Sequence, residues 1–246
     1  MFNFFITKDK ISNQTAYIDG SDFNHIKNVL RMRVGEKFLI SVDGQSHLCQ
    51  LKSFLNQVVE ATIIEQNYND TSLPIQIHLF QALPKADKLE LVIQKAVVLG
   101  AEQIFPVQTE RCVVKIEDKK MKSKVERWNA IAESSAKQCK RAFVPKVNEV
   151  FSFGKILELI KTYDMFLVAY ENEQGVISTK NALQNIRRNM KIGVLVGSEG
   201  GLSQKEVDLL TANGALTISL GKRILRTETA SITALSILMM HAEMNL

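Results

Sequence analysis

Two apolar runs in the C-terminal third of the chain constrain its fold more than any other feature. The run at 193–196 is followed by a glycine-rich loop, 197–201, and the run at 216–220 is followed by a basic loop, 221–226. Short runs of Leu and β-branched residues next to glycine are typical of buried strands. Because a helix is expected after each loop, both loops should lie at the carboxyl edge of a sheet, where open α/β sheets bind ligands.

Helix-capping signals follow both loops. Ser203 and Glu206 have the spacing of a capping box, in which the hydroxyl and the carboxylate each accept a free backbone N–H at the helix start. Thr227 or Thr229 is expected to cap the last helix, and Glu228 in its first turn suits the positive end of the helix dipole. This last helix is apolar on nearly every side, which predicts burial inside the domain or in a subunit interface.

From Ile75 onwards, strand patterns alternate with helix patterns. Asp87 and Glu90 predict a second capping box, and Gly100 is expected to end that helix. The alternation favours a parallel sheet with helices on both faces. The expected strands are 75–83, 104–107 and 165–170, and the expected helices are 87–99, 124–141, 153–161 and 178–186.

The first 72 residues have a different, β-rich pattern. Strands are expected at 37–42, 47–53 and 58–64, and the pair Asp43-Gly44 predicts a hairpin turn between the first two. Ser21 is expected to cap a short helix that ends near Leu30. The polar stretch 67–72 is followed by Pro74, so we expect a boundary between two domains, 1–72 and 73–246.

Positive charge is concentrated in one stretch of the chain. The whole sequence carries a net charge of +5, whereas residues 111–146 alone hold eleven Lys and Arg against four Asp and Glu. Such a surface binds phosphates by releasing counterions, although a merely solvated face is an equal alternative. Trp128 in this stretch can stack on a base, but a core position is more common for a helical tryptophan. The candidate nucleic-acid contacts are Lys120, Lys124, Arg127, Lys140 and Arg141 here, and Arg31 and Arg33 in the N-terminal part, where a solvated helix end is an equal alternative.

Cysteine and histidine usage argues against disulfides and metal. The three cysteines, Cys49, Cys112 and Cys139, are far apart and odd in number, which favours a reducing compartment. Neither the cysteines nor the histidines have metal-ligand spacing, so no metal is expected. The N-terminus lacks the pattern of a signal peptide, and no apolar segment reaches the roughly 20 residues of a membrane span. We therefore predict a soluble, cytoplasmic protein without membrane contact.

The glycine-rich loop does not have the spacing of a phosphate-binding motif. It matches neither the P-loop nor the dinucleotide fingerprint, which disfavours a nucleotide-dependent oxidoreductase, and Glu199 would repel a pyrophosphate. Glycines let backbone groups approach an adenine or a ribose, so a nucleoside with a neutral or cationic tail fits this loop better. A structural role for Glu199, accepting backbone N–H bonds, is an equal alternative.

The basic loop combines cations with apolar side chains. Lys222, Arg223 and Arg226 bring three positive charges to the same sheet edge, and Ile224 and Leu225 separate them. Such a loop can wall an adenine pocket with its apolar side chains while its guanidinium groups meet RNA phosphate.

At these two loops the chain resembles a known family. The strings 197–206 and 220–230 resemble the paired signatures of the bacterial small-subunit ribosomal RNA uracil-N3-methyltransferases, which belong to the SPOUT superfamily of knotted methyltransferases. Further blocks similar to that family are 85–115 and the residues Gln138, Arg141 and Pro145. The chain departs from the family pattern at Val98, Lys137 and Ser198, where Glu, Glu and Pro are usual.

The resemblance implies both a fold and an activity. The fold is an α/β C-terminal domain with a trefoil-knotted, mostly parallel sheet and helices on both faces, plus a small N-terminal β-barrel of the PUA-like, RNA-binding type. The activity is methylation of N3 of one uridine in 16S ribosomal RNA, free or in the small ribosomal subunit, by a homodimer that uses S-adenosyl-L-methionine. A ribose 2′-O-methyltransferase of the same superfamily and a non-catalytic RNA-binding protein remain as alternatives.

Residue roles follow from the loops and the resemblance together. N3 of uridine carries a proton, so the reaction needs a base or a cation that stabilises the developing anion. Arg226 and Arg223 are the candidate cations, and Glu228 is the candidate base, with a structural role as its alternative. The candidate cofactor residues lie in and beside the two loops: Val168, Ala169, Leu195, Val196, Gly197, Glu199, Gly200, Gly201, Leu220, Gly221, Ile224, Leu225 and Thr229.

Overall fold

The computed structural model describes residues 1–68, 70–171 and 175–246, which form two compact units. The first unit comprises Met1–Ser72 and Ala136–Val144, and the second comprises Leu73–Ser135 and Pro145–Leu246. The segment Ala136–Val144 therefore belongs to the first unit, although it lies far beyond the expected N-terminal domain in the sequence.

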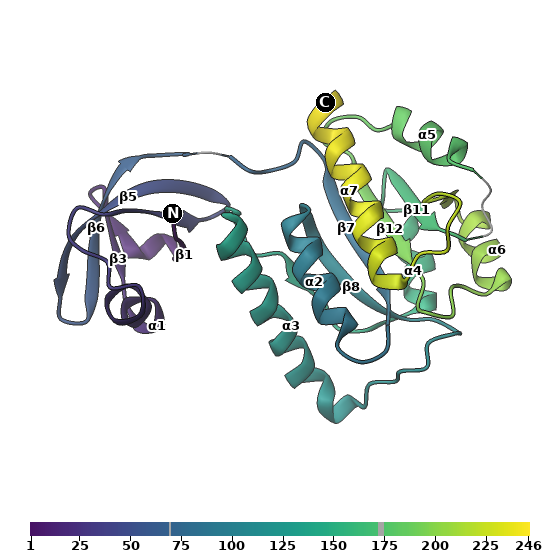
Figure 1. Ribbon diagram of the computed structural model, residues 1–246, viewed down its shortest axis with the longest axis horizontal. Coiled ribbons are helices and arrows are strands. Elements are labelled where there is room, and N and C mark those ends of the chain that lie inside the picture. Colours follow the sequence, from purple (N-terminus) through teal and green to yellow (C-terminus); the bar gives the residue numbers. More distant parts are fainter. Residues whose placement is uncertain (69, 172–174) are drawn as a thin grey trace. The chain divides into compact units, whose positions relative to one another are not determined.

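The first unit contains a six-stranded sheet in the order β1-β4-β5-β6-β3-β2. Figure 1 labels four of its strands, β1, β3, β5 and β6. β1 pairs with β4 in parallel, and the other neighbours are antiparallel. Asp43 and Gly44 have φ angles of 49° and 78°, the backbone of a tight hairpin turn, so the predicted hairpin is confirmed. The strands are β1 (Asn3–Phe5), β2 (Ile11–Ser12), β3 (Thr15–Ile18), β4 (Lys37–Val42), β5 (Gln45–Leu55) and β6 (Val58–Glu65).

The N-cap of the short helix in the first unit lies two residues before the expected Ser21. α1 (Gly20–Asn24) has Asp19 rather than Ser21 at its N-cap, and no side chain makes a capping hydrogen bond there. Gly20 adopts a φ of 62°, which glycine reaches without strain, and this turns the chain into the helix before Ser21. The helix then continues as one wider turn, His25–Val29, in which the Leu30 N–H bonds the His25 carbonyl.

The second unit contains a seven-stranded sheet in which every described pairing is parallel. The strand order is β10-β8-β7-β12-β11-β13, with β9 beside β8. β12 therefore lies between β7 and β11, and β13 lies on the far side of β11. The strands are β7 (Gln76–Ala82), β8 (Ala101–Gln108), β9 (Lys146–Val147), β10 (Phe151–Ser152), β11 (Met165–Ala169), β12 (Lys191–Val196) and β13 (Leu216–Ile218).

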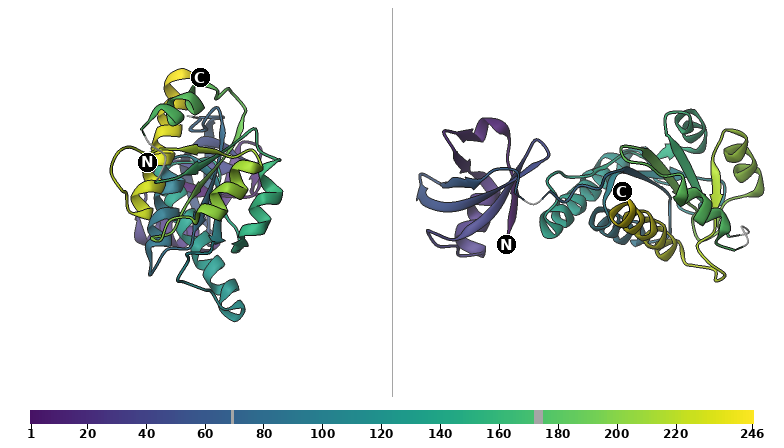
Figure 2. Two further views of the ribbon diagram at one scale, coloured as in Figure 1. Left: turned by 90° about the vertical axis from the view of Figure 1, so that its right-hand side faces the viewer. Right: turned by 90° about the horizontal axis from the view of Figure 1, so that it is seen from above.

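Helices cover both faces of this sheet, as the alternating pattern predicts. α2 and α7 pack side by side on one face, against β7, β8 and β12 (Figures 1 and 2). α4 and α6 cover the other face, where Ile156 and Leu210 join an aromatic core around Phe80, Phe105 and Phe166. The helices are α2 (Lys88–Val98), α3 (Asp118–Cys139), α4 (Phe153–Ile160), α5 (Ile177–Gln184), α6 (Gln204–Ala212) and α7 (Thr227–Asn245).

One predicted capping box is confirmed and the other is wrong. At α6 the Glu206 N–H bonds the Ser203 hydroxyl at 3.3 Å, and the Ser203 N–H bonds the Glu206 carboxylate at 2.9 Å. At α2 the side chain of Asp87 makes no capping bond. The Glu90 carboxylate instead forms an ion pair with Arg127 Nε at 2.7 Å, which draws it away from the helix start.

Candidate active site

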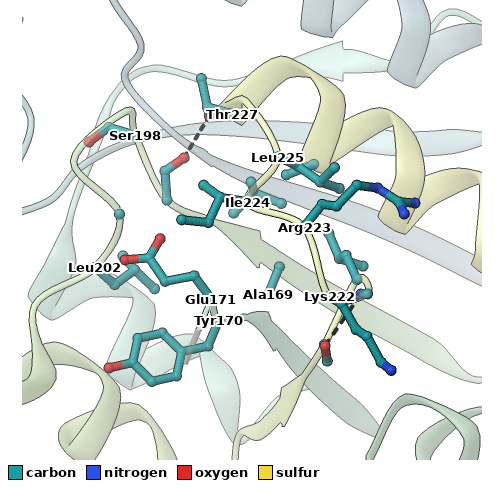
Figure 3. A pocket seen from close by; sticks show the side chains of 17 residues that line it. Ala169, Tyr170, Glu171, Ser198, Leu202, Lys222, Arg223, Ile224, Leu225 and Thr227 are labelled. Carbon is teal, nitrogen blue, oxygen red and sulfur yellow. Dashed lines mark hydrogen bonds between the residues drawn. The ribbon is translucent and has the colours of Figure 1, made fainter. Parts of the chain in front are cut away.

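The loops that follow β11, β12 and β13 surround a cavity of about 100 Å³ at the carboxyl edge of the sheet (Figure 3). The strand order explains their meeting, because β12 and β13 flank β11 and all three strands run in the same direction. Nine of the predicted site residues line this cavity: Ala169, Val196, Gly197, Gly201, Leu220, Gly221, Arg223, Ile224 and Leu225.

Five predicted cofactor residues do not line the cavity. Val168 and Leu195 are fully buried in the core on the α4 and α6 face, because alternate residues of a strand point to opposite faces. Glu199 and Gly200 lie in the loop but outside the cavity lining, and Thr229 of α7 is outside it as well, although its neighbour Ala230 lines the cavity. The cavity therefore does not support the expected ligand contacts at these five residues.

The cavity is also lined by residues that the sequence patterns did not single out as cofactor contacts. These are Tyr170, Glu171, Ser198, Leu202, Ser219, Lys222, Thr227 and Ala230. Figure 3 shows Tyr170, Glu171 and Leu202 on one side of the cavity and Lys222 and Arg223 on the other. The signal that could have found Tyr170 and Glu171 is their position directly after the buried strand β11.

Small residues allow the glycine-rich loop to fold tightly. A Cβ atom on Gly197 would lie 2.9 Å from the carbonyl carbon of Gly201, and Gly201 itself has a φ of 68°. Arg111 holds the outer side of the loop, since its Nη1 donates to the Gly200 carbonyl at 2.9 Å. The hydroxyl of Ser198 donates back to the Arg111 carbonyl at 3.3 Å.

Glu199 anchors this loop to the segment before α2. Its carboxylate accepts the Lys85 backbone N–H at 3.1 Å and the Lys88 ammonium at 2.8 Å. Burial by itself raises the pKa of Glu199, but the hydrogen bonds from Lys88 and from backbone N–H groups outweigh it, so the pKa lies below its ordinary value. A structural role, the alternative to a ligand contact, therefore accounts for the contacts of Glu199.

A buried polar network connects the loop to α7. The N-cap of α7 is Arg226, so Thr227 does not cap the helix. The Thr227 hydroxyl instead donates to the Gly197 carbonyl at 2.6 Å. The fully buried Gln81, from the end of β7, donates to the Thr227 hydroxyl at 2.9 Å and accepts a hydrogen bond from the Ser231 hydroxyl. The predicted threonine cap is therefore wrong, because Thr227 faces the loop after β12. Gln81 is a polar residue within an otherwise apolar strand pattern, and this could have marked it in the sequence as a residue with a special role.

The candidate catalytic residues lie at two places. Arg223 lines the cavity, whereas Arg226 and Glu228 do not and lie at the start of α7. The side chain of Glu228 is 14% exposed and its Oε2 lies 3.5 Å from the Lys88 ammonium. Ile224, between the two arginines, is 88% exposed, so an apolar side chain of this loop is available to a ligand.

The candidate RNA contacts also differ in their surroundings. Arg31 and Arg33 are exposed, and Lys120 lies 3.4 Å from Glu117. The ion pair with Glu90 raises the pKa of Arg127, which keeps a 64% exposed side chain. Lys124 lines a hollow beside α3, and Lys140 is half-buried.

Arg141 and Trp128 are buried. The Arg141 guanidinium lies 4.3 Å from the centre of the Phe143 ring and the residue is only 7% exposed, so the structure does not support the expected RNA contact at Arg141. Trp128 is 3% exposed, which agrees with the core alternative rather than base stacking.

The described part of the chain contains neither a membrane-spanning helix nor a metal-binding cluster. Within residues 1–68, 70–171 and 175–246, no helix is long and apolar enough to span a bilayer. Over the same ranges, His, Cys, Asp and Glu side chains do not gather into a group of three that could hold a metal ion.

Comparison with known proteins identifies the family. The model of an RNA methyltransferase domain matches residues 71–239. The protein named ribosomal RNA small subunit methyltransferase E from Bacillus subtilis (strain 168) is 40% identical over 244 residues, which cover 97% of this chain and 95% of that protein. The chain belongs to this RNA methyltransferase family. The resemblance predicted from the two loops is thereby confirmed, and it extends over nearly the whole chain.

Other relatives agree with this family. The protein of the same name from Buchnera aphidicola subsp. Schizaphis graminum (strain Sg) is 31% identical over 231 residues, which cover 92% of this chain and 90% of that protein. The crystal structure of the Neisseria gonorrhoeae methyltransferase E bound to S-adenosyl methionine is 29% identical, with a TM-score of 0.83, and covers 98% of this chain and 97% of that one. A model of an RNA methyltransferase PUA domain matches residues 18–53, in agreement with the expected PUA-like N-terminal part.

Proposed function

We propose that this family member transfers a methyl group from S-adenosyl-L-methionine to N3 of one uridine in 16S ribosomal RNA. The observation that carries the proposal is the cavity at which the glycine-rich and basic loops meet. Relatives that match nearly the whole chain are named as small-subunit ribosomal RNA methyltransferases, and the structure of the Neisseria relative is bound to S-adenosyl methionine. This substrate implies that the enzyme works in the cytoplasm, where ribosomal subunits are assembled.

The residues around the cavity fit the proposed cofactor. Gly197 and Gly201 bring bare backbone to its wall, and Ile224 and Leu225 supply apolar surface for an adenine. Glu171 adds a carboxylate, which suits ribose hydroxyls or a cationic tail. When bound, S-adenosylmethionine supplies the sulfonium methyl that is transferred.

The chain's own residues must position the uridine and remove its N3 proton. N3 lies on the Watson–Crick edge, so the base must be unpaired or flipped out of a helix. Good alignment of the reacting atoms is worth roughly 7–11 kcal/mol. In our proposal the guanidinium groups of Arg226 and Arg223 stabilise the negative charge that develops on the ring, and Glu228 accepts the proton.

We also infer the finer features of the fold. The position of β12 between β7 and β11, with β13 beyond β11, supports a trefoil knot of the SPOUT type in a methyltransferase domain, 73–246. The PUA match supports an RNA-binding, barrel-like domain at 1–72. We propose that the reaction uses no metal ion.

Exposed apolar side chains support a homodimer. Leu91 and Val98 on α2 are 42% and 43% exposed, and Met240 and Met244 on the neighbouring α7 are 45% and 73% exposed. Apolar residues gathered on adjacent helices are typical of subunit interfaces. Light scattering that gives the mass of a single chain at working concentration would reject the dimer.

The proposed function is tested by identifying the methylated nucleoside. The purified protein is incubated with 16S ribosomal RNA or with small subunits and S-adenosylmethionine, and the RNA is digested and examined by mass spectrometry. We expect N3-methyluridine in the complete reaction and none when the cofactor is omitted. A 2′-O-methylated nucleoside would instead identify a ribose methyltransferase. No product, together with no cofactor binding in calorimetry, would identify a non-catalytic RNA-binding protein.

A further inference from the structure

Lys88 lies where three segments of the second unit meet. It is the first residue of α2, and its ammonium is 2.8 Å from Glu199 Oε1 and 3.5 Å from Glu228 Oε2. Glu199 belongs to the loop after β12, and Glu228 belongs to the first turn of α7. One ammonium group therefore connects the glycine-rich loop with the first turn of α7, which carries the candidate base Glu228 and directly follows Arg226.

Both carboxylates are largely shielded from solvent beside this cation. The side chain of Glu199 is 26% exposed and that of Glu228 is 14% exposed. Oε2 of Glu228 is buried and, among the residues that the structure describes, it accepts no hydrogen bond. A sheltered carboxylate oxygen without a hydrogen bond is costly, so the nearby charge of Lys88 is its compensation. The hydrogen bond to Glu199 raises the pKa of Lys88, which therefore stays an ammonium.

Other contacts hold the same segments without Lys88. The Thr227 hydroxyl bonds the Gly197 carbonyl, and Arg111 bonds the Gly200 carbonyl. The Lys85 backbone N–H also bonds Glu199. Loss of Lys88 should therefore leave the fold intact and change only how accurately the loop and the helix start are aligned.

We propose that Lys88 is a positioning residue for methyl transfer, which aligns the glycine-rich loop with the first turn of α7 through Glu199 and Glu228. The inference rests on the proposed function, because the loop and the helix start face the reacting groups only if the cavity holds the cofactor. Lys88 does not line the cavity and acts through the two carboxylates. Replacing Lys88 should therefore lower turnover as well as cofactor affinity.

The first test compares Lys88→Met, Lys88→Arg and a control, Lys95→Met, in the full-length protein. Lys95 is an exposed lysine on the same helix, so its substitution removes an equal charge without touching either carboxylate. We expect Lys88→Met to lower kcat by about tenfold at saturating cofactor and RNA, with Lys88→Arg recovering most of it. Lys95→Met should match the unmodified protein. Thermal unfolding checks that all variants are folded, and a folded Lys88→Met with unchanged kcat overturns the proposal.

The second test is a double-mutant cycle on cofactor binding, measured by calorimetry without RNA. Lys88→Met and Glu199→Gln break the same ion pair, so their effects on the dissociation constant should be far from additive. Additive effects would refute the coupling. This measurement needs no product, so it also separates the two proposals. A protein that binds the cofactor but makes no N3-methyluridine refutes the proposed function. The cycle still decides in that case whether Lys88 couples to the loop.

Discussion

At the scale of residues, the site depends on side chains whose roles cannot be read from their type alone. Glu199 has the position of a ligand contact in the sequence, yet its carboxylate is occupied by Lys85 and Lys88. Arg141 has the charge of an RNA contact but is buried over Phe143. In both cases the partner supplied by the fold decides what the charged group does, because a sheltered charge must be compensated.

Arg226 provides the prediction at this scale. Arg226→Ala should lower turnover by about 100-fold or more, because a cation that stabilises charge only in the transition state acts on kcat. Its side chain does not line the cavity, so cofactor affinity should stay nearly the same. Single-turnover kinetics and calorimetry measure the two quantities. Arg188→Ala, at an exposed arginine of the same unit, is the control, and a folded Arg226→Ala with normal turnover would contradict the assignment.

At the scale of elements, some local signals formed as predicted and others did not. The hairpin at Asp43 and the capping box at Ser203 both form as predicted. The caps expected at Asp87 and at Thr227 do not form, because Glu90 pairs with Arg127 and Thr227 bonds Gly197. A local capping signal is therefore overridden when a distant partner offers the same side chain a better contact.

The capping box gives the prediction at this scale. Ser203→Ala should destabilise the second unit by about 1 kcal/mol, because it removes the hydroxyl that accepts the Glu206 N–H. The matched control is Ser178→Ala, since the buried Ser178 hydroxyl has no hydrogen-bond partner among the described residues. Urea unfolding should show no loss of stability for this control. Equal stability of the two variants would show that the capping box contributes nothing measurable.

At the scale of the whole molecule, the positive charges of residues 111–146 have unequal surroundings. Some of these charges are already engaged, since Arg127 faces Glu90 and Arg141 is buried. The exposed remainder is the part available to phosphate, so the net charge of a stretch overstates the surface that can bind RNA.

Charge reversal tests this surface. Replacing Lys120, Lys124 and Lys140 by Glu should weaken RNA binding and flatten its dependence on salt, by about one unit of slope for each phosphate that is no longer neutralised. The same replacement at Lys161, Lys180 and Lys205, three exposed lysines of the second unit outside the basic stretch, is the control for net charge. Filter binding across a salt series measures both effects. Equal effects of the two triple substitutions would show that only the overall charge matters.

The sequence by itself determined the alternation of strands and helices, the hairpin, one capping box and the two signature loops. These depend on residues close together in the chain, whose periodicity and turn chemistry are visible in a single sequence. Only the tertiary structure decided that Lys88 meets Glu199, 111 positions away, and that Gln81 meets Thr227, 146 positions away. Those contacts follow from the placement of β12 between β7 and β11, and strand order is set by long-range packing that no local pattern records.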